Sequence, residues 1–399
     1  MRILLVTKLG FNPQVLRWVR CLRTEGTDVA CIHIGTPHGD TGGLDSNEGL
    51  SLHYLFDEGV SKPQRRLLRL FRRYRTILQY ERPDIIWALC FSVVLLPLIW
   101  AKSICRIPLV VTACGSDINI QARNIKNRLV FRHLIRHSEL ITTTACTMMD
   151  KLQAIVRVPR AKRLVHYWGI DLDAFSPMTV GERTRARQHY GIHNDDVVIF
   201  MGRIYRPIAY YSEAIDALAQ LAASPASHQF RAVFVNWASD PGVVSKVTSK
   251  VRSLGLEERC IFIDRQLSAS ELREVYGMSD IALNLLWADQ LGAMIFESLA
   301  MGCILVTTDL PQYLMLPGQG LQLFYVRREK ILPDLLTRLE FLMENLEVVR
   351  RAVVDGNSRI VARDYDFARE VAVFAEVLGS LAASHHTLSA RARTAEAQK

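Results

Sequence analysis

The residues with the clearest potential for chemistry lie in one segment, 289–302, which reads Asp-Gln-Leu-Gly-Ala-Met-Ile-Phe-Glu-Ser-Leu-Ala-Met-Gly. Glu297 is the only charged residue between Asp289 and Asp309, and its apolar neighbours are typical of a helix packed into a core. Burying a carboxylate is unfavourable unless hydrogen-bond donors surround it. Another side chain or the hydroxyl groups of a ligand must therefore supply those donors.

Gly292 lies between the two acids, Asp289 and Glu297, at the expected start of this helix. A glycine there lets a ligand approach backbone N–H groups, those of Leu291 and Gly292, that have no partner within the helix. These groups lie at the positive end of the helix dipole, which suits a phosphate. The segment predicts two carboxylates that flank a diphosphate, one for a sugar and one for a ribose. A core helix with one paired Glu explains the same pattern.

The elements that must position this segment are short apolar runs that alternate with helical patterns. Expected strands include 2–7, 29–34, 108–112, 197–202, 260–263 and 304–306, and expected helices include 13–25, 64–80, 243–254 and 270–277. This alternation predicts an α/β fold with parallel, doubly wound sheets, and 399 residues suffice for two domains. Only Gly10 follows the first strand, so the sequence argues against a dehydrogenase-type dinucleotide site there.

The cysteines and the apolar runs bear on the compartment. The eight cysteines are scattered, with no C-x-x-C pair and no Cys/His cluster, which favours a reduced cytoplasmic compartment and no structural zinc. The apolar run at 1–7 is too short for a signal peptide. The run at 85–101 is interrupted by Ser92 and Pro97 and is shorter than the roughly 20 residues that span a bilayer.

Positive charge is concentrated in the first half of the chain. Residues 1–175 hold 25 Lys and Arg against 14 Asp and Glu, whereas 176–399 hold 24 against 26. In the helix expected at 64–80, an apolar stripe at 67, 71, 74 and 78 lies opposite arginines at 65, 69, 72 and 73. Such a helix could lie on an anionic membrane surface, or it could be an ordinary helix with a solvated face. No nucleic-acid-binding motif accompanies the charge.

Four segments resemble, in the same order, the motifs of the retaining glycosyltransferases of family four, also called glycosyl transferases group 1. The pair Asp289 and Glu297 resembles the family's E-x7-E signature, with Asp in the first place. The turn 113–117 resembles its H-G-S-D turn, although Cys114 stands where His is usual, so that Gly115 and Asp117 are the matching positions. An N-cap of the next helix is an equally good explanation for Asp117.

The two other motifs are a loop and a strand end. Residues 169–177 resemble the family's interdomain signature G-[VI]-D-x3-F-x-P, and Gly202-Arg203 resembles its G-R pair. In the family a Lys follows about five residues after this pair, and the two cations grip the donor diphosphate. Position 208 is Ile here, so Arg206 is the nearest substitute, and a surface ion pair is the alternative for Arg203.

The resemblance implies a GT-B fold, in which two Rossmann-like doubly wound domains face a cleft. Its expected divisions are an acceptor-side domain at 1–175, a linker at 176–190, a nucleotide-sugar-binding domain at 191–365, a helix at 366–383 that packs back on the first domain, and a disordered tail at 384–399.

The resemblance also implies an activity, namely transfer of a sugar from a nucleoside diphosphate sugar, with retention at the anomeric carbon and without a metal or other cofactor. Arg203, Arg206 and the backbone at Leu291 and Gly292 would neutralise the diphosphate. Glu297 would bind the ribose, and Asp289 would hold the donor sugar.

The implied acceptor is a glycan or a lipid-linked group, used in cell-surface polysaccharide or glycolipid synthesis by a cytoplasmic enzyme that is peripheral on the inner face of the membrane. The departures from the family at Cys114, Ile208 and Asp289 leave one alternative open, an inactive nucleotide-sugar-binding scaffold that partners another transferase. An epimerase or a phosphorylase on the same fold is a weaker alternative.

Overall fold

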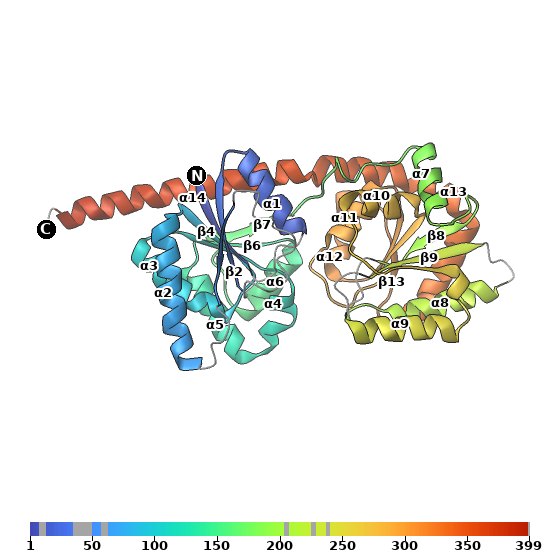
Figure 1. Ribbon diagram of the computed structural model, residues 1–399, viewed down its shortest axis with the longest axis horizontal. Helices are drawn as coiled ribbons and strands as arrows, with labels where there is room; N and C mark the ends of the chain where they lie inside the picture. Colours follow the sequence, from blue (N-terminus) through green and yellow to red (C-terminus); the bar gives the residue numbers. More distant parts are fainter. Residues whose placement is uncertain are drawn as a thin grey trace. The chain divides into compact units, whose positions relative to one another are not determined.

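The computed structural model describes residues 1–7, 13–34, 50–56, 63–202, 207–224, 229–236 and 240–397. The chain forms two compact units, of which the N-terminal unit comprises Met1–Trp168 with Ala368–Lys399 and the C-terminal unit comprises Gly169–Phe367 (Figure 1). Each unit has one sheet in which every strand pair is parallel. The predicted α/β class with two doubly wound domains is confirmed.

The sheet of the N-terminal unit has seven strands in the order β3-β2-β1-β4-β5-β6-β7. The strands are β1 (Arg2–Thr7), β2 (Asp28–His33), β3 (Ser51–Tyr54), β4 (Ile85–Leu89), β5 (Leu109–Thr112), β6 (Leu140–Thr143) and β7 (Arg163–Val165). The strand order reverses between β1 and β4, where doubly wound sheets bind their ligands.

Helices cover both faces of this sheet. They are α1 (Pro13–Thr24), α2 (Pro63–Glu81), α3 (Leu96–Cys105), α4 (Ser116–Asn119), α5 (Ile125–His137), α6 (Cys146–Ile155) and, from the end of the chain, α14 (Phe367–Ala397). Helices α2, α3 and α5 lie side by side in one layer (Figure 1). In α2 the buried apolar positions are 70, 74, 77 and 78, whereas Leu67 is 42% exposed, which corrects the predicted stripe.

Helix α14 belongs to the N-terminal unit because its aromatic side chain packs into that core. Phe374 lies with its ring centroid 5.6 Å from Trp18, 5.0 Å from Trp87 and 4.8 Å from His166. The Nδ1 atom of His166 also lies 3.3 Å from a carboxylate oxygen of Glu370. The last segment of the chain therefore completes the core that the first segment begins.

The sheet of the C-terminal unit has six strands in the order β10-β9-β8-β11-β12-β13, with the reversal between β8 and β11. The strands are β8 (Val197–Phe200), β9 (Phe230–Val235), β10 (Cys260–Ile263), β11 (Ile281–Asn284), β12 (Ile304–Thr308) and β13 (Phe324–Val326). The helices are α7 (Val180–His189), α8 (Tyr211–Ala223), α9 (Pro241–Ser253), α10 (Ala269–Met278), α11 (Ala293–Ala300), α12 (Pro311–Leu314) and α13 (Ile331–Asp364), which is kinked at Asn345.

The structure corrects three of the predicted divisions. Residues 176–190 are not a linker, because most of them form α7, a helix of the C-terminal unit. The boundary between the units falls after Trp168 rather than after residue 175. Residues 384–397 continue helix α14 and are not a disordered tail.

The chain enters and leaves the C-terminal unit at neighbouring points. Ile170 and Asp366 form a parallel bridge, and the N–H of Phe367 donates to the carbonyl of Ile170 over 2.9 Å. Gly169 has a φ of +67°, and a Cβ atom there would lie 2.6 Å from the Cα of Phe367. Only glycine fits this crossing, which explains the glycine of the loop motif at 169–177.

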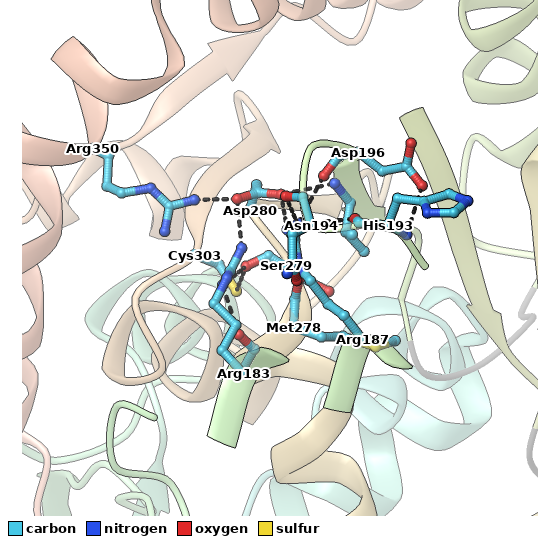
Figure 2. Close-up of polar contacts among 12 residues, drawn as sticks. Arg183, Arg187, His193, Asn194, Asp196, Met278, Ser279, Asp280, Cys303 and Arg350 are labelled. Carbon is cyan, nitrogen blue, oxygen red and sulfur yellow. Dashed lines mark hydrogen bonds and ion pairs between the residues drawn. The ribbon is translucent and has the colours of Figure 1, made fainter. Parts of the chain in front are cut away.

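A buried ion cluster fastens the amino edge of the C-terminal sheet (Figure 2). Asp280, which directly precedes β11, is paired with Arg183 of α7 at 2.6 Å, with Arg187 of α7 at 2.7 Å and with Arg350 of α13. Its carboxylate also accepts the N–H of Val198 in β8 over 2.8 Å. One carboxylate thus joins two helices and two strands.

The N-terminal sheet has a comparable cluster at its own amino edge. Glu81, at the end of α2, is fully buried and bonds to Arg2 of β1 and to Ser51 and His53 of β3. Burial raises the pKa of Glu81, but the hydrogen bonds from Ser51 and His53 and the charge of Arg2 outweigh it, so the pKa is lowered. The carboxylate is therefore held in its charged form.

In the part of the chain that the structure describes, no helix has both the length and the apolar character needed to cross a bilayer.

Candidate active site

The segment at 289–302 lies at the carboxyl edge of the C-terminal sheet, beside the point where the strand order reverses. Strands β8 and β11 are neighbours there. Gly202 follows β8, and the loop that begins after β11 leads through Asp289 to α11. This is the place at which doubly wound sheets bind ligands.

Helix α11 begins where the sequence predicts it. Gly292 is its N-cap and provides no side-chain hydrogen bond, so backbone N–H groups at this end depend on other partners. The preceding residue, Leu291, has a φ of +94°, a left-handed conformation that is unfavourable for a residue with a Cβ. Strained residues of this kind cluster at functional sites.

Asp289 organises this turn. One of its carboxylate oxygens accepts the N–H of Gly292 over 2.8 Å and that of Leu291 over 3.3 Å, and it also accepts the hydroxyl of Tyr313 over 2.6 Å. The Nε2 atom of Gln312 donates to the carbonyl of Asp289 over 2.8 Å. Burial and the charge of Asp289 raise the pKa of Tyr313, which keeps its hydroxyl a donor. The two amides predicted to meet the diphosphate therefore bond to Asp289.

Glu297 is buried in the second turn of α11, with 4% of its surface exposed. The hydroxyl of Tyr276 in α10 donates to its carboxylate over 2.9 Å. Tyr276 is itself held by edge contacts with Phe175 at 5.9 Å and with Phe200 at 5.1 Å. Phe175, the aromatic residue of the loop motif, thus positions the phenol that bonds to Glu297.

Gly202 lies against the first turn of α11. Its φ is +109°, and a Cβ atom there would lie 3.8 Å from the sulfur of Met294 and 4.0 Å from the carbonyl of Leu283. The structure therefore brings the end of β8 next to the amino end of α11. Arg203 and Arg206, the cations predicted to grip the diphosphate, lie outside the described residues.

The two loops that follow β8 and β11 are joined to each other. Ala209 and Leu286 form an antiparallel bridge, and the N–H of Trp287 donates to the carbonyl of Ile208 over 2.9 Å. The indole of Trp287 donates to the carbonyl of Pro207 over 3.1 Å. Ile208, where the family has a cation, thus contributes its backbone to the pairing of these loops.

In the N-terminal unit, the turn after β5 is built around Asp117. This fully buried carboxylate accepts the N–H groups of Phe91 at 2.8 Å, of Cys114 at 3.1 Å and of Ile118 at 2.9 Å. Burial raises its pKa, and these backbone bonds act in the opposite direction. The structure therefore places the side chain of Asp117 in the scaffold of the turn, and not at its surface, where a donor contact was predicted. Gly115, with a φ of +83°, completes the turn.

Cys114 occupies the position at which the family has a histidine. Burial and the neighbouring thiol of Cys90 raise the pKa of Cys114 well above its ordinary value. Its side chain is therefore a neutral thiol.

Three residues of the site were not predicted, namely Tyr276, Gln312 and Tyr313. Tyr276 belongs to a predicted helix but looks in the sequence like any aromatic core residue, and the other two follow Pro311 in α12. Their distance along the sequence from Asp289 and Glu297 follows no recognisable spacing, because only the fold brings their helices next to the two acids. Within the described ranges, no group of three or more His, Cys, Asp or Glu side chains could hold a metal ion.

Two family models match the chain. Residues 10–168 match the glycosyl transferase 4-like domain, and residues 195–345 match the glycosyl transferases group 1 domain. The two ranges together span more than three quarters of the chain. No curated protein sequence matches it.

Solved structures share the whole fold at low sequence identity. Anabaena HepE in complex with UDP and glucose has a TM-score of 0.76 at 18% identity, covering 95% of this chain and 100% of its own. A glycosyltransferase from Rickettsia africae has a TM-score of 0.80 at 15% identity, covering 95% and 98%. WaaG, a glycosyltransferase involved in lipopolysaccharide biosynthesis, has a TM-score of 0.71 at 14% identity, covering 94% and 99%. The fold is therefore GT-B, and the chain is a glycosyltransferase that belongs to the glycosyl transferases group 1 family.

Proposed function

We propose that the protein moves a sugar from a nucleoside diphosphate sugar to a glycan or lipid-linked acceptor, with retention at the anomeric carbon. The observation that carries the proposal is the strained turn at Leu291 and Gly292, which lies at the amino end of α11, beside Gly202 and ahead of the buried Glu297. The helix end suits a diphosphate, and a carboxylate suits the hydroxyls of a ribose.

In the proposed reaction, the bond between the anomeric carbon and the diphosphate oxygen breaks, the acceptor oxygen bonds to that carbon, and the proton of the acceptor hydroxyl passes to the leaving diphosphate. Negative charge grows on the leaving diphosphate, so donors that are already in place at the helix end lower the barrier most. Arg203 and Arg206 remain the predicted cations for this charge. No metal is proposed.

Asp289 has two candidate roles that can be separated. Its carboxylate and a bound diphosphate would compete for the amides of Leu291 and Gly292, because Asp289 already accepts from both. If Asp289 only shapes the turn, then Asp289→Asn, which still offers an oxygen, should keep kcat within about threefold. If it holds the donor sugar in the transition state, kcat should fall by about 100-fold or more.

The test of the proposed function is a panel of nucleoside diphosphate sugars, with and without glycan and lipid-linked acceptors. HepE binds UDP and UDP-glucose, so UDP-glucose is the first donor to try. We expect nucleoside diphosphate release that depends on the acceptor, and a product with the anomeric configuration of the donor by NMR. Binding without turnover would instead favour the scaffold, and an inverted product would reject retention.

We also propose that the layer of α2, α3 and α5 docks on an anionic membrane surface. Large apolar side chains are exposed there, among them Trp100 (51%) and Ile104 (58%) of α3 and Leu129 (60%) of α5. Arginines of α2 and α5 accompany them, which is the composition of an interfacial surface. A peripheral position on the inner face of the membrane would follow.

Sedimentation with anionic vesicles tests this docking. We expect the protein to sediment at low salt. Trp100→Ala/Ile104→Ala should need at least about 100-fold more lipid for the same sedimentation, because each buried apolar side chain contributes about 1.5–3 kcal/mol. Val180→Ala, which removes an exposed apolar residue from the C-terminal unit, is the control. Equal sedimentation of the unaltered protein, the double variant and Val180→Ala would contradict the proposed docking.

A further inference from the structure

The surface of the N-terminal unit has an open hollow of about 550 Å³ between β3 and α2, which we call the basic pocket. It is lined from β3 by Leu52, His53 and Tyr54 and from α2 by Arg69, Arg72, Arg73, Thr76 and Ile77. Strand β3 is the terminal strand of the sheet, so the pocket lies at the sheet's edge. None of the residues assigned to donor chemistry lines it.

The lining residues of α2 share one face of the helix. Positions 72, 73 and 76 follow Arg69 by three, four and seven residues, a spacing that places their side chains on the same side of the helix as Arg69. This face adjoins the buried positions 70, 74 and 77, which hold the helix against the sheet. The helix is thus fixed by its apolar stripe while three guanidinium groups turn toward β3.

The described lining of the basic pocket carries positive charge. Among the residues that the structure describes, no carboxylate lines the pocket, and neither Arg69 nor Arg72 has an ion-pair partner. The nearby acid, Glu81, is fully buried and already bonds to Arg2 and His53. Guanidinium groups bind phosphate oxygens in a bidentate manner, so the lining favours a phosphate.

The volume exceeds what a phosphate alone needs. The rings of His53 and Tyr54 and the apolar Leu52 and Ile77 provide contact surface for a larger group attached to the phosphate. A phosphorylated sugar combines the required anion with hydroxyls and a small apolar face. We propose that the basic pocket binds a phosphorylated sugar and that the acceptor carries this group; the second part rests on the proposed transfer reaction.

The experiment titrates glucose 6-phosphate into the full-length protein by calorimetry, with saturating UDP present to occupy the proposed donor site. We expect binding, with Arg69→Gln and Arg72→Gln each weakening it at least about tenfold, because each removes a charge-assisted hydrogen bond. Arg75→Gln, an equal change on α2 outside the pocket, should stay within about twofold. Thr76→Phe should also weaken binding, because its ring occupies part of the pocket, with no change in charge.

Three results would overturn the proposal: no binding by the unaltered protein, an equal loss in all three arginine variants, or unchanged binding in Thr76→Phe. Vesicles of phosphatidylglycerol form the second arm. If the pocket variants lose only vesicle binding and glucose 6-phosphate does not bind, the phosphate belongs to a lipid headgroup and the acceptor assignment is wrong. Nucleoside diphosphate release from the panel of donors and acceptors, measured in parallel, reports the transfer reaction separately. If no combination releases nucleoside diphosphate while the pocket behaves as expected, the transfer reaction has failed and the pocket has not.

Discussion

The two edges of the C-terminal sheet are built in opposite ways. At the amino edge, Asp280 is paired with three arginines. At the carboxyl edge, Gly202 and Leu291 have positive φ angles, and Asp289 bonds to neutral donors. Charge pairs hold one edge rigid, whereas the other edge accepts strain where a ligand is proposed to bind, so stability and activity should respond to mutations at different edges.

The largest expected effect is that of Asp280→Asn. The substitution leaves three guanidinium groups without their buried counter-charge, so we expect a loss of about 3–5 kcal/mol in the free energy of unfolding. Urea denaturation measures this loss, and Asp355→Asn on the exposed face of α13 should change it by less than about 0.5 kcal/mol. A loss below about 1 kcal/mol for Asp280→Asn would mean that the amino edge is not held by its ion cluster.

Glu297→Gln should show the opposite pattern. The carboxamide oxygen can still accept the hydroxyl of Tyr276, so we expect a stability change below about 1 kcal/mol. The KM for the donor should rise about 10- to 100-fold, because a charged hydrogen bond to the ligand is lost. Steady-state kinetics measure this change in KM, with the surface substitution Glu344→Gln as the control. Unchanged kinetics in Glu297→Gln would contradict the assignment of Glu297 to the donor site.

Glu81 extends the comparison to the amino edge of the other sheet. Its pKa is lowered on folding, so its charged form contributes stability that is complete above the ordinary value of 4.5 and is lost as the pH falls through the lower folded value. Glu81→Gln should therefore be less stable than the unaltered protein by about 1–2 kcal/mol at neutral pH, and this difference should shrink below pH 4.5.

Thermal unfolding across this pH range provides the measurement. Glu25→Gln, an exposed acid after α1, should reproduce the profile of the unaltered protein. A difference between Glu81→Gln and the unaltered protein that stays constant with pH would show that the charge of Glu81 plays no part.

The smallest expected effect concerns backbone strain. Gly202→Ala should lose about 1 kcal/mol, because an L-residue is unfavourable at positive φ while the space around the new Cβ is adequate. Gly26→Ala, at a φ of +75° with nothing within 4 Å, should lose a similar amount. Only Gly202→Ala should also reduce donor turnover. If both variants turn over donor alike, the end of β8 has no part in the site.

The strands and the start of α11 were predictable because they depend on local patterns. Apolar runs identified β8 and β12, and a glycine before an apolar run identified the amino end of α11. The partners of the two acids were not predictable, because Tyr276 and Tyr313 reach them from other helices. Such contacts depend on packing and not on spacing along the chain.

The error at 176–190 has a physical reason. Helix α7 contains mostly polar and charged residues, and its sequence, VGERTRARQH, lacks the apolar stripe that predicts a packed helix. It is held instead by Arg183 and Arg187, whose partner Asp280 lies more than 90 residues away. A helix attached by ions resembles a linker when only hydrophobic periodicity is considered.

The interrupted N-terminal unit has a consequence for synthesis on the ribosome. Residues 169–367 form a continuous unit and can fold as soon as they emerge, whereas the aromatic core of Trp18 and Trp87 must wait for Phe374. The nascent chain therefore carries an unfinished first domain through most of its translation. A chain stopped after Phe367 should bind a dye for exposed apolar surface, and adding α14 as a separate peptide should displace that dye.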